Sequence, residues 1–376
     1  MTLRSFSYGR LLGDFEVGAT FEHPWEVTVD TGMAALFQAS FLDATPTYAS
    51  AAFARDLGFR DRPIHPLLLL NLGLSFSVHD VSEQAIAHLA YLHVRFPEAA
   101  FAGDTLHARS TVLGVKPTQS GDRGVVHVRT SLARDDETVV CTFERRALVR
   151  AGRLSNRPEP EPPADGGRAR VGPPQADVAC LPAEMREFIR TPRRGRGFAG
   201  FARDFAVGDV IVHELGRTVS EAEHMQLTFL VRNSHPLHYD EVYCKSGASF
   251  AGTRVVYGGL VFSWIATLAS RDTCGNVLWD MGWHEGAHPS GVVAGDTLFA
   301  ASRVSAIESH DAATARVTFR LVGTKNVPPA VLLTQGADLF SPELGKKVGK
   351  VPEKVFEIDR TVLMRKGAVV SGGADG

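Results

Sequence analysis

Two long apolar stretches stand out along the chain, LLLLNLGLSFSV at residues 67–78 and LVFSWIATLAS at residues 260–270. Neither carries the polar stripe of a surface helix, so the pattern is typical of a helix that is buried on every side. The sequence therefore predicts one buried helix in each half of the chain.

Shorter runs in which apolar and polar residues alternate follow each apolar stretch. Alternation with a period of two is typical of antiparallel strands that bury one face. We predict strands at residues 88–96, 105–115, 124–134, 139–150, 297–307, 315–324 and 330–340. Each half is therefore interpreted as one helix wrapped by an antiparallel sheet, which is an α+β arrangement.

Short sequence motifs recur in the two halves in the same order. DFEVG at 14–18 returns as DFAVG at 204–208, and AGDTL at 102–106 returns unchanged at 294–298. Chance matches would not keep such similar spacing, so the recurrence indicates a duplicated domain. The period is far longer than that of a solenoid repeat, and we expect two paired domains.

A proline-rich segment separates the halves. Residues 151–197 hold eight of the 20 prolines together with scattered glycines and charges, a composition that stays extended, with one short helix expected around PAEMREFI. We predict an N-terminal domain at 1–150, this linker at 151–197, a C-terminal domain at 198–345 and a C-terminal extension at 346–376 whose last residues are disordered.

Composition limits the function classes. The chain is 44% hydrophobic and 22% charged, as is ordinary for a globular protein. A formal net charge of −2 offers no basic surplus for nucleic acid or an anionic membrane. The four cysteines are widely spaced, and no signal peptide or membrane-length apolar run is recognisable. We expect a cytoplasmic protein without disulfides, metal site or membrane anchor.

A second set of short motifs surrounds the two predicted helices in the same order in each half. The second half has NSHPLH at 233–238, YGG at 257–259 and AGDT at 294–297. The first half has DATPTY at 43–48 and IHP at 64–66, followed by its own AGDT. These motifs resemble those of the MaoC-like, R-specific enoyl-CoA hydratases and dehydratases, which carry D-x-N-P-x-H before the central helix, then [HY]-G at the helix start and G-D-T on a later strand.

Within this family the chain resembles in particular the mesaconyl-CoA (2-methylfumaryl-CoA) hydratases, through words such as TVSEAEH at 218–224 and LVGTKN at 321–326. The resemblance implies a double hot dog fold and an acyl-CoA thioester as substrate. It also implies a lyase that needs neither metal nor redox cofactor, with coenzyme A present only as part of the substrate.

The resemblance places an active site in the second half. His238 occupies the family's His position and is expected to act as acid and base on the water that adds to the double bond. Asn233 stands where the family has Asp, and it can orient water but cannot accept its proton. Asp240, two residues beyond His238, is expected to orient the imidazole.

The same resemblance suggests how the enolate oxygen would be stabilised. The backbone N–H groups of Gly258 and Gly259 stand at the start of the predicted helix, where unpaired amides and the helix dipole favour negative charge. Tyr257 would add a hydroxyl donor. Each of these residues also has a purely structural explanation, as a turn residue or a core aromatic.

The first half offers a second candidate site, formed by Asp43, Tyr48 and His65. Asp43 supplies the carboxylate that the second half lacks, but Tyr48 replaces the His of the signature. His65 could pair with Asp43 through folding of the loop. In a pseudo-twofold arrangement the two sets belong to opposite sites, so we do not expect Asp43 to complete the site of His238.

The cations that would bind the substrate are not fixed by the sequence. Arg193, Arg194 and Arg196 cluster at the end of the linker and could meet coenzyme A phosphates, although such runs are usually solvated. A dicarboxylate acyl group would need a buried arginine. The candidates are Arg62, Arg95, Arg232 and Arg254.

The sequence thus predicts an acyl-CoA hydratase or dehydratase with its site in the second half. It leaves open which acyl group is used and whether the chain forms a homo-oligomer. Two alternatives remain: a hot dog thioesterase, in which water attacks the thioester carbonyl, and a catalytically inactive acyl-CoA-binding paralogue, which the incomplete signatures would permit.

Overall fold

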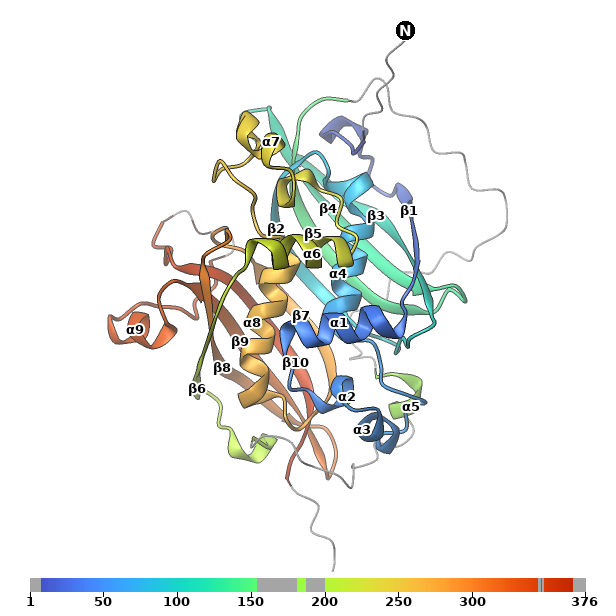
Figure 1. Ribbon diagram of the computed structural model, residues 1–376, viewed down its shortest axis with the longest axis vertical. Coiled ribbons are helices and arrows are strands. Elements are labelled where there is room, and N and C mark those ends of the chain that lie inside the picture. Colours follow the sequence, from blue (N-terminus) through green and yellow to red (C-terminus); the bar gives the residue numbers. More distant parts are fainter. Residues whose placement is uncertain (1–7, 154–180, 187–199, 344–345, 347, 368–376) are drawn as a thin grey trace, which may run out of the picture.

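The computed structural model describes residues 8–153, 181–186, 200–343, 346 and 348–367 (Figure 1). Most of the predicted linker and the end of the predicted extension lie outside these residues, as do Arg193, Arg194 and Arg196. The predicted linker helix is observed in its first turn, α5 (Ala183–Arg186). In the described part of the chain, no helix has the length and apolar character needed to cross a membrane.

Ten antiparallel strands form one continuous sheet in the order β1-β3-β4-β5-β2-β7-β10-β9-β8-β6. Their bounds are β1 Thr20–Thr28, β2 Ala85–Arg95, β3 Thr105–Pro117, β4 Arg123–Arg134, β5 Val139–Arg150, β6 Val210–Thr218, β7 Val277–Ala287, β8 Thr297–Ser309, β9 Thr314–Lys325 and β10 Lys354–Arg365. The order of the first five strands is mirrored in the last five. The duplicated domains therefore meet where β2 pairs with β7.

Both predicted central helices are present and lie side by side on one face of the sheet (Figure 1). All residues of α4 (Pro66–Phe76) are buried, and Pro66 stands at its first turn, where a missing N–H costs nothing. In α8 (Gly258–Thr273) the amide of Asn71 from α4 reaches Ser263 Oγ at 3.0 Å. The two halves consequently share one hydrophobic core.

Shorter helices complete the structure. They are α1 (Thr31–Phe41), α2 (Pro46–Ala49), α3 (Ala51–Asp56), α6 (Glu221–Leu230), α7 (Glu241–Tyr243) and α9 (Pro329–Thr334). Figure 1 shows α1 and α6 in front of the two central helices, and both contact α8, so each signature loop, which follows α1 or α6, is held over the central helices.

Two predictions about the second half are wrong. Residues 330–340 form α9 and a loop instead of a strand, because Pro329 opens a helical turn and Leu332, Leu339 and Phe340 pack as a small separate cluster. The segment after residue 345 is not a peripheral extension. It contains β10, which pairs with both β7 and β9, so the second unit reaches at least Arg365.

Candidate active site

A partly open cavity of about 130 Å³ is lined by residues of both halves of the molecule. The second half lines it with Asn233, His238, Tyr257 and Gly258. The first half contributes the end of α4, the turn Val78–Ser82, and parts of β2 and β5. Four of the six residues predicted for the second-half site therefore meet at one cavity.

A repeated turn carries the first signature residue of each half. Leu42 after α1 and Arg232 after α6 both adopt left-handed conformations, with φ of 55° and 62°. The next residue, Asp43 or Asn233, then accepts the backbone N–H two positions further on, at 2.7 and 3.0 Å respectively. Asp43 and Asn233 thus share a structural role in this turn, which is the role that a carboxylate and an amide can both fill.

His238 is held in one tautomer by the backbone. It ends the 3-10 turn Pro236–His238, and its Nδ1 lies 2.8 Å from the carbonyl oxygen of Val255. A carbonyl only accepts, so Nδ1 carries the proton and Nε2 of the neutral ring has a free lone pair. Burial, assisted by neighbouring His235, lowers the pKa of His238 to about 3. The ring is therefore neutral at physiological pH.

Asp240 does not orient this ring, contrary to the prediction. Its side chain is exposed and accepts the backbone N–H of Tyr243 at 3.0 Å, which caps the short helix α7. The carbonyl of Val255 supplies the orientation that we had assigned to a carboxylate. Proximity in sequence failed as a guide because the chain turns away from the cavity after His238.

The helix α8 begins at the cavity. The N–H groups of Leu260 and Val261 reach the carbonyl of Tyr257 at 2.9 and 3.2 Å, which leaves those of Gly258 and Gly259 without an intrahelical partner. Gly258 lines the cavity, whereas Gly259 lies behind it against α4. The predicted pair of donors therefore stands at the correct helix end, with Gly258 at the cavity wall.

Tyr257 lies between these elements. Its ring centroid is 5.4 Å from that of His238. Burial raises the pKa of its hydroxyl to about 12, against smaller opposing effects from Ser75, Arg145 and Asn233. The hydroxyl is therefore protonated at neutral pH and can act as a hydrogen-bond donor in the cavity.

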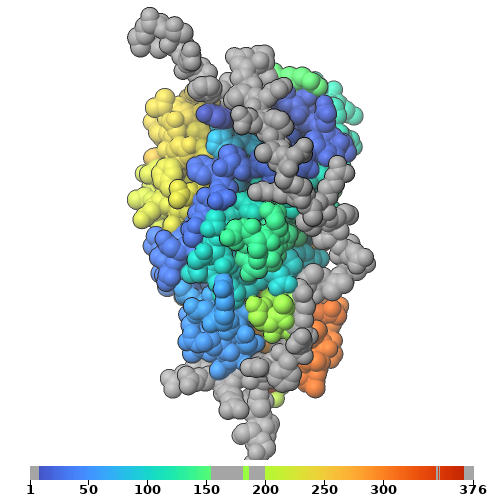
Figure 2. Space-filling view, turned by 90° about the vertical axis from the view of Figure 1, so that its right-hand side faces the viewer, coloured from blue at the N-terminus to red at the C-terminus, as the bar shows by residue number. Residues whose placement is uncertain are grey.

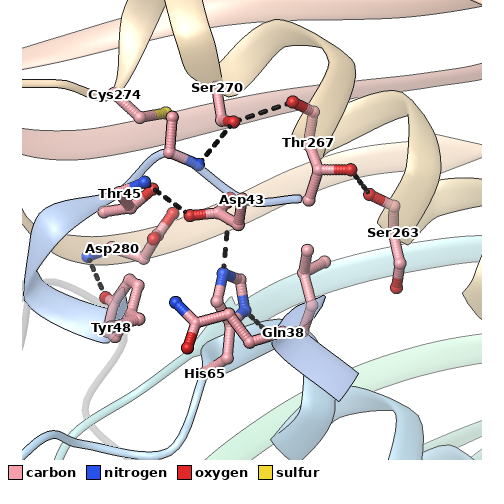
Figure 3. Close-up of polar contacts among 12 residues, drawn as sticks. Gln38, Asp43, Thr45, Tyr48, His65, Ser263, Thr267, Ser270, Cys274 and Asp280 are labelled. Carbon is pink, nitrogen blue, oxygen red and sulfur yellow. Dashed lines mark hydrogen bonds and ion pairs between the residues drawn. The ribbon is translucent and has the colours of Figure 1, made fainter. Parts of the chain in front are cut away.

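The first-half candidates also come together, but inside the core (Figure 3). His65 Nε2 lies 3.5 Å from Asp43 Oδ2, so the predicted pairing of these residues is confirmed. Burial raises the pKa of Asp43, but His65 and smaller contributions outweigh it and hold the pKa at about 2. Tyr48 accepts the backbone N–H of Asp280 at 3.1 Å and is 1% exposed. None of the three predicted residues lines the 130 Å³ cavity.

The two halves place the same two ring types in exchanged positions. In the first half the signature ends in Tyr48 and the residue before the central helix is His65, with ring centroids 4.8 Å apart. In the second half the signature ends in His238 and the residue before the helix is Tyr257. The two sets are separate, because the Asp43 loop contacts Ser270 of α8 whereas the Asn233 loop faces the first half.

Sequence reasoning missed the arginine of the cavity, Arg145 on β5. It is 3% exposed, and along the strand it shares the buried face of Phe143, Ala147 and Val149. A charged residue on the apolar side of an alternating strand is a signal that the sequence contained. His88, Tyr91 and His288 line the same cavity and were also missed.

The four arginines that had been considered for a substrate carboxylate do not line this cavity. Arg62 donates to Gln38 Oε1 at 2.6 Å, and Arg254 pairs with Glu221 and Glu241. Arg95 donates to the carbonyl of its neighbour Val94, and Arg232 is exposed. Within the described residues, no three or more His, Cys, Asp or Glu side chains are grouped so that they could hold a metal ion.

Comparison with known proteins shows the family to which the chain belongs. A family model described as mesaconyl-CoA hydratase matches residues 4–328. The chain is 33% identical over 322 residues to a mesaconyl-CoA hydratase from Cereibacter sphaeroides, covering 85% of this chain and 90% of that protein. It is 31% identical over 298 residues to a β-methylmalyl-CoA dehydratase from Chloroflexus aurantiacus, covering 79% and 82%.

Solved structures share the fold. A putative MaoC domain protein dehydratase from Chloroflexus aurantiacus aligns with a TM-score of 0.79 and 28% identity, over 96% of this chain and 98% of that one. A conserved hypothetical protein from Mycobacterium tuberculosis, described as a double hot dog, aligns with a TM-score of 0.69 and 22% identity over 95% and 98%. The predicted α+β double hot dog is thereby confirmed. Because the family model spans most of the sequence, the chain belongs to the mesaconyl-CoA hydratase family and is a lyase of the hydratase and dehydratase type.

Proposed function

We propose that the protein catalyses the reversible addition of water to a short α,β-unsaturated acyl-CoA such as mesaconyl-CoA, with His238 as acid and base. The observation that carries this proposal is a neutral His238 at the wall of a cavity where the helix α8 also begins. The names of the relatives support the substrate class.

The first step requires a base and a held water. The free lone pair of His238 Nε2 accepts a proton from water, and the oxygen attacks the β-carbon of the double bond. Asn233 lies at the same cavity and can position that water through its amide, but it cannot share the proton. His238 is therefore the sole acid–base group of the pair.

The negative charge that forms during attack passes to the thioester oxygen as an enolate. The amide of Gly258 and the positive end of α8 are placed to stabilise it. The enolate also favours the protonated His238, so the ring can hold the proton transiently despite its low pKa in the free protein. The proton then passes to the α-carbon, which completes the addition of H and OH.

A second cavity of about 420 Å³ adjoins the first and suits the coenzyme A portion. Glu83, Arg150, Pro236 and Tyr243 help to line it, and their neighbours Ser82 and His235 line the inner cavity. Figure 2 shows this part of the second half, in yellow, at the surface beside the first half. We assign Arg150 to a coenzyme A phosphate. Burial and Asp80 raise the pKa of Glu83 to about 7, which reduces the negative charge that a phosphate would meet.

The test follows the absorbance of the enoyl-thioester band with mesaconyl-CoA and, separately, crotonyl-CoA. The wild-type protein is compared with His238→Gln and with Asp43→Asn, which gives the first half the residue that the second half already has. We expect His238→Gln to lower kcat by about 10²- to 10⁴-fold, as loss of an acid–base group does. Asp43→Asn should retain activity if it remains folded.

Three other outcomes would replace the proposed hydratase function or the proposed site. Release of free thiol with the loss of absorbance would indicate a thioesterase. Tight binding without turnover would indicate that Asn233 in the Asp position is disabling and that the protein is an acyl-CoA-binding paralogue. Loss of activity in Asp43→Asn but not in His238→Gln would transfer the reaction to the first half.

The proposed reaction needs neither metal nor redox cofactor, because it consists of proton transfers and stabilisation of an enolate. The cytoplasm is the proposed compartment. The cysteines in the described part of the chain, Cys141, Cys244 and Cys274, are free and buried, as suits a reducing environment.

A further inference from the structure

The guanidinium of Arg145 is buried at the active-site cavity, and no carboxylate among the described residues is paired with it. Within the described residues its hydrogen bonds go to neutral groups only: Nη2 to Ser77 Oγ at 2.8 Å and to the Ser77 carbonyl at 3.3 Å, and Nη1 to Ser82 Oγ at 3.3 Å. Its Nε is buried and has no partner there. A buried cation of this kind is costly unless an anion completes its environment.

The other half of the duplicated fold contains an equivalent arginine with which Arg145 can be compared. Arg145 on β5 stands opposite Tyr91 of β2, and Arg360 on β10 stands opposite Trp283 of β7 in the equivalent strand pair. Both arginines are therefore at the same position of the repeated sheet. Arg360 is 4% exposed, close to the 3% of Arg145. Any difference between their surroundings is therefore due neither to position in the sheet nor to burial.

The difference is the counter-ion. Arg360 makes a two-point pair with Asp280, with Nε at 2.6 Å from Oδ1 and Nη2 at 3.0 Å from Oδ2. Two residues after Arg360 on β10, Val362 stands opposite Asp280 of β7. Two residues after Arg145 on β5, Ala147 stands opposite His88 of β2. His88 thus takes the place of the carboxylate beside Arg145.

His88 cannot neutralise the guanidinium. Both of its ring nitrogens are buried without a hydrogen-bond partner in the described structure, and burial together with His288 and Arg145 pushes its pKa well below the ordinary range. Burial also lowers the pKa of Arg145 to about 10, which still leaves it charged at neutral pH. Among the described residues the cavity lining therefore carries one positive charge, that of Arg145, without the counter-ion that Asp280 provides to Arg360.

We propose that Arg145 binds a carboxylate on the acyl part of the substrate, which selects coenzyme A thioesters of dicarboxylic acids over those of simple fatty acids. The carboxylate supplies to Arg145 the negative charge that Asp280 supplies to Arg360, and it reaches the guanidinium from the cavity that Arg145 lines. This inference rests on the proposed function. It adds a residue that determines specificity.

The test measures kcat/KM and the dissociation constant for mesaconyl-CoA and crotonyl-CoA, which differ in whether the acyl group carries a carboxylate. The variant is Arg145→Gln. Its matched control is Arg146→Gln, the same change at the exposed neighbouring position of β5. We expect Arg145→Gln to weaken use of mesaconyl-CoA by about 10²- to 10³-fold, as loss of one member of a buried charge pair does, with a much smaller effect on crotonyl-CoA. Arg146→Gln should change neither.

A second variant tests the same idea without removing the arginine. His88→Asp supplies the missing carboxylate in the pattern of Asp280 and Arg360. It should exclude mesaconyl-CoA while crotonyl-CoA still binds, and it carries the test if Arg145→Gln does not fold.

The outcomes separate this proposal from the proposed function. Equal losses for both substrates in Arg145→Gln and in His88→Asp would show a merely structural arginine and overturn the inference. If the wild-type protein hydrates neither substrate, the proposed reaction fails, yet the binding preference for the carboxylate and its loss in the variants still decide the role of Arg145.

Discussion

The neutral state of His238 at the cavity wall predicts a specific dependence of stability on pH. Its pKa is about 3 in the folded protein and about 6.5 in an unfolded chain. Between these values the unfolded state binds a proton that the folded state does not, so stability falls as the pH is lowered through 6.5 and levels off near 3. At pH 5 this one ring lowers the free energy of unfolding by about 2 kcal/mol relative to neutral pH. The value is about 1.4 kcal/mol for each of the 1.5 pH units between 6.5 and 5. This magnitude depends mainly on the pKa of the unfolded chain.

Urea unfolding at pH 7.5 and pH 5 tests this magnitude. His238→Gln should lose about 2 kcal/mol less stability over that interval than the wild-type protein, because Gln does not titrate. The comparison concerns the change with pH, so any loss of packing in the variant cancels. The exposed His310, replaced by Gln in the same way, serves as the control and should leave the wild-type dependence unchanged. Equal pH dependence in His238→Gln and the wild type would refute a neutral, buried His238.

Two further predictions follow from the same geometry. The ratio kcat/KM for hydration should not fall between pH 8 and pH 5, since His238 is already deprotonated there and protonation of Glu83 near pH 7 only removes negative charge from the coenzyme A cavity. A fall in kcat/KM below pH 6.5, seen in a pH–rate profile, would contradict this. Gly259→Ala should lower the unfolding free energy by about 1 to 3 kcal/mol in chemical denaturation, since the added methyl would overlap Asn71 Oδ1 and the Tyr257 ring, and an unchanged stability would show that α4 and α8 can separate.

The sequence predicted those helices and strands whose hydrophobic pattern is set by burial alone. The helices α4 and α8 are apolar on all sides, and β3 and β4 alternate cleanly, so each was found close to its observed bounds. In contrast, β10 is a central strand whose buried face carries charges, because Lys354 pairs with Glu357 and Arg360 with Asp280 inside the protein. Buried ion pairs break the apolar alternation, and only the sheet itself explains why they are tolerated.

The residues of the candidate site also fall into two groups, those that local motifs predicted and one that they did not. Asn233, His238, Tyr257 and Gly258 lie on short segments whose spacing is fixed by one turn and one helix start, and the structure brings them to one cavity. Arg145 reaches that cavity only through the pairing of β5 with β2 and the contact between the halves. No local sequence motif encodes this strand pairing, although a charged residue on the apolar face of β5 indicated a buried arginine.

The duplication allows the two equivalent sites to be compared directly. Around the first-half signature, Asp43 lies beside His65, and Asp280 of β7 pairs with Arg360 of β10. At the second-half cavity Asn233 stands in place of the acid, and no carboxylate of the described residues pairs with Arg145 of β5. The pseudo-symmetric sheet gives both arginines the same burial, so the difference in pairing cannot be attributed to exposure. A substrate that brings its own carboxylate would give Arg145 the counter-ion that Arg360 already has.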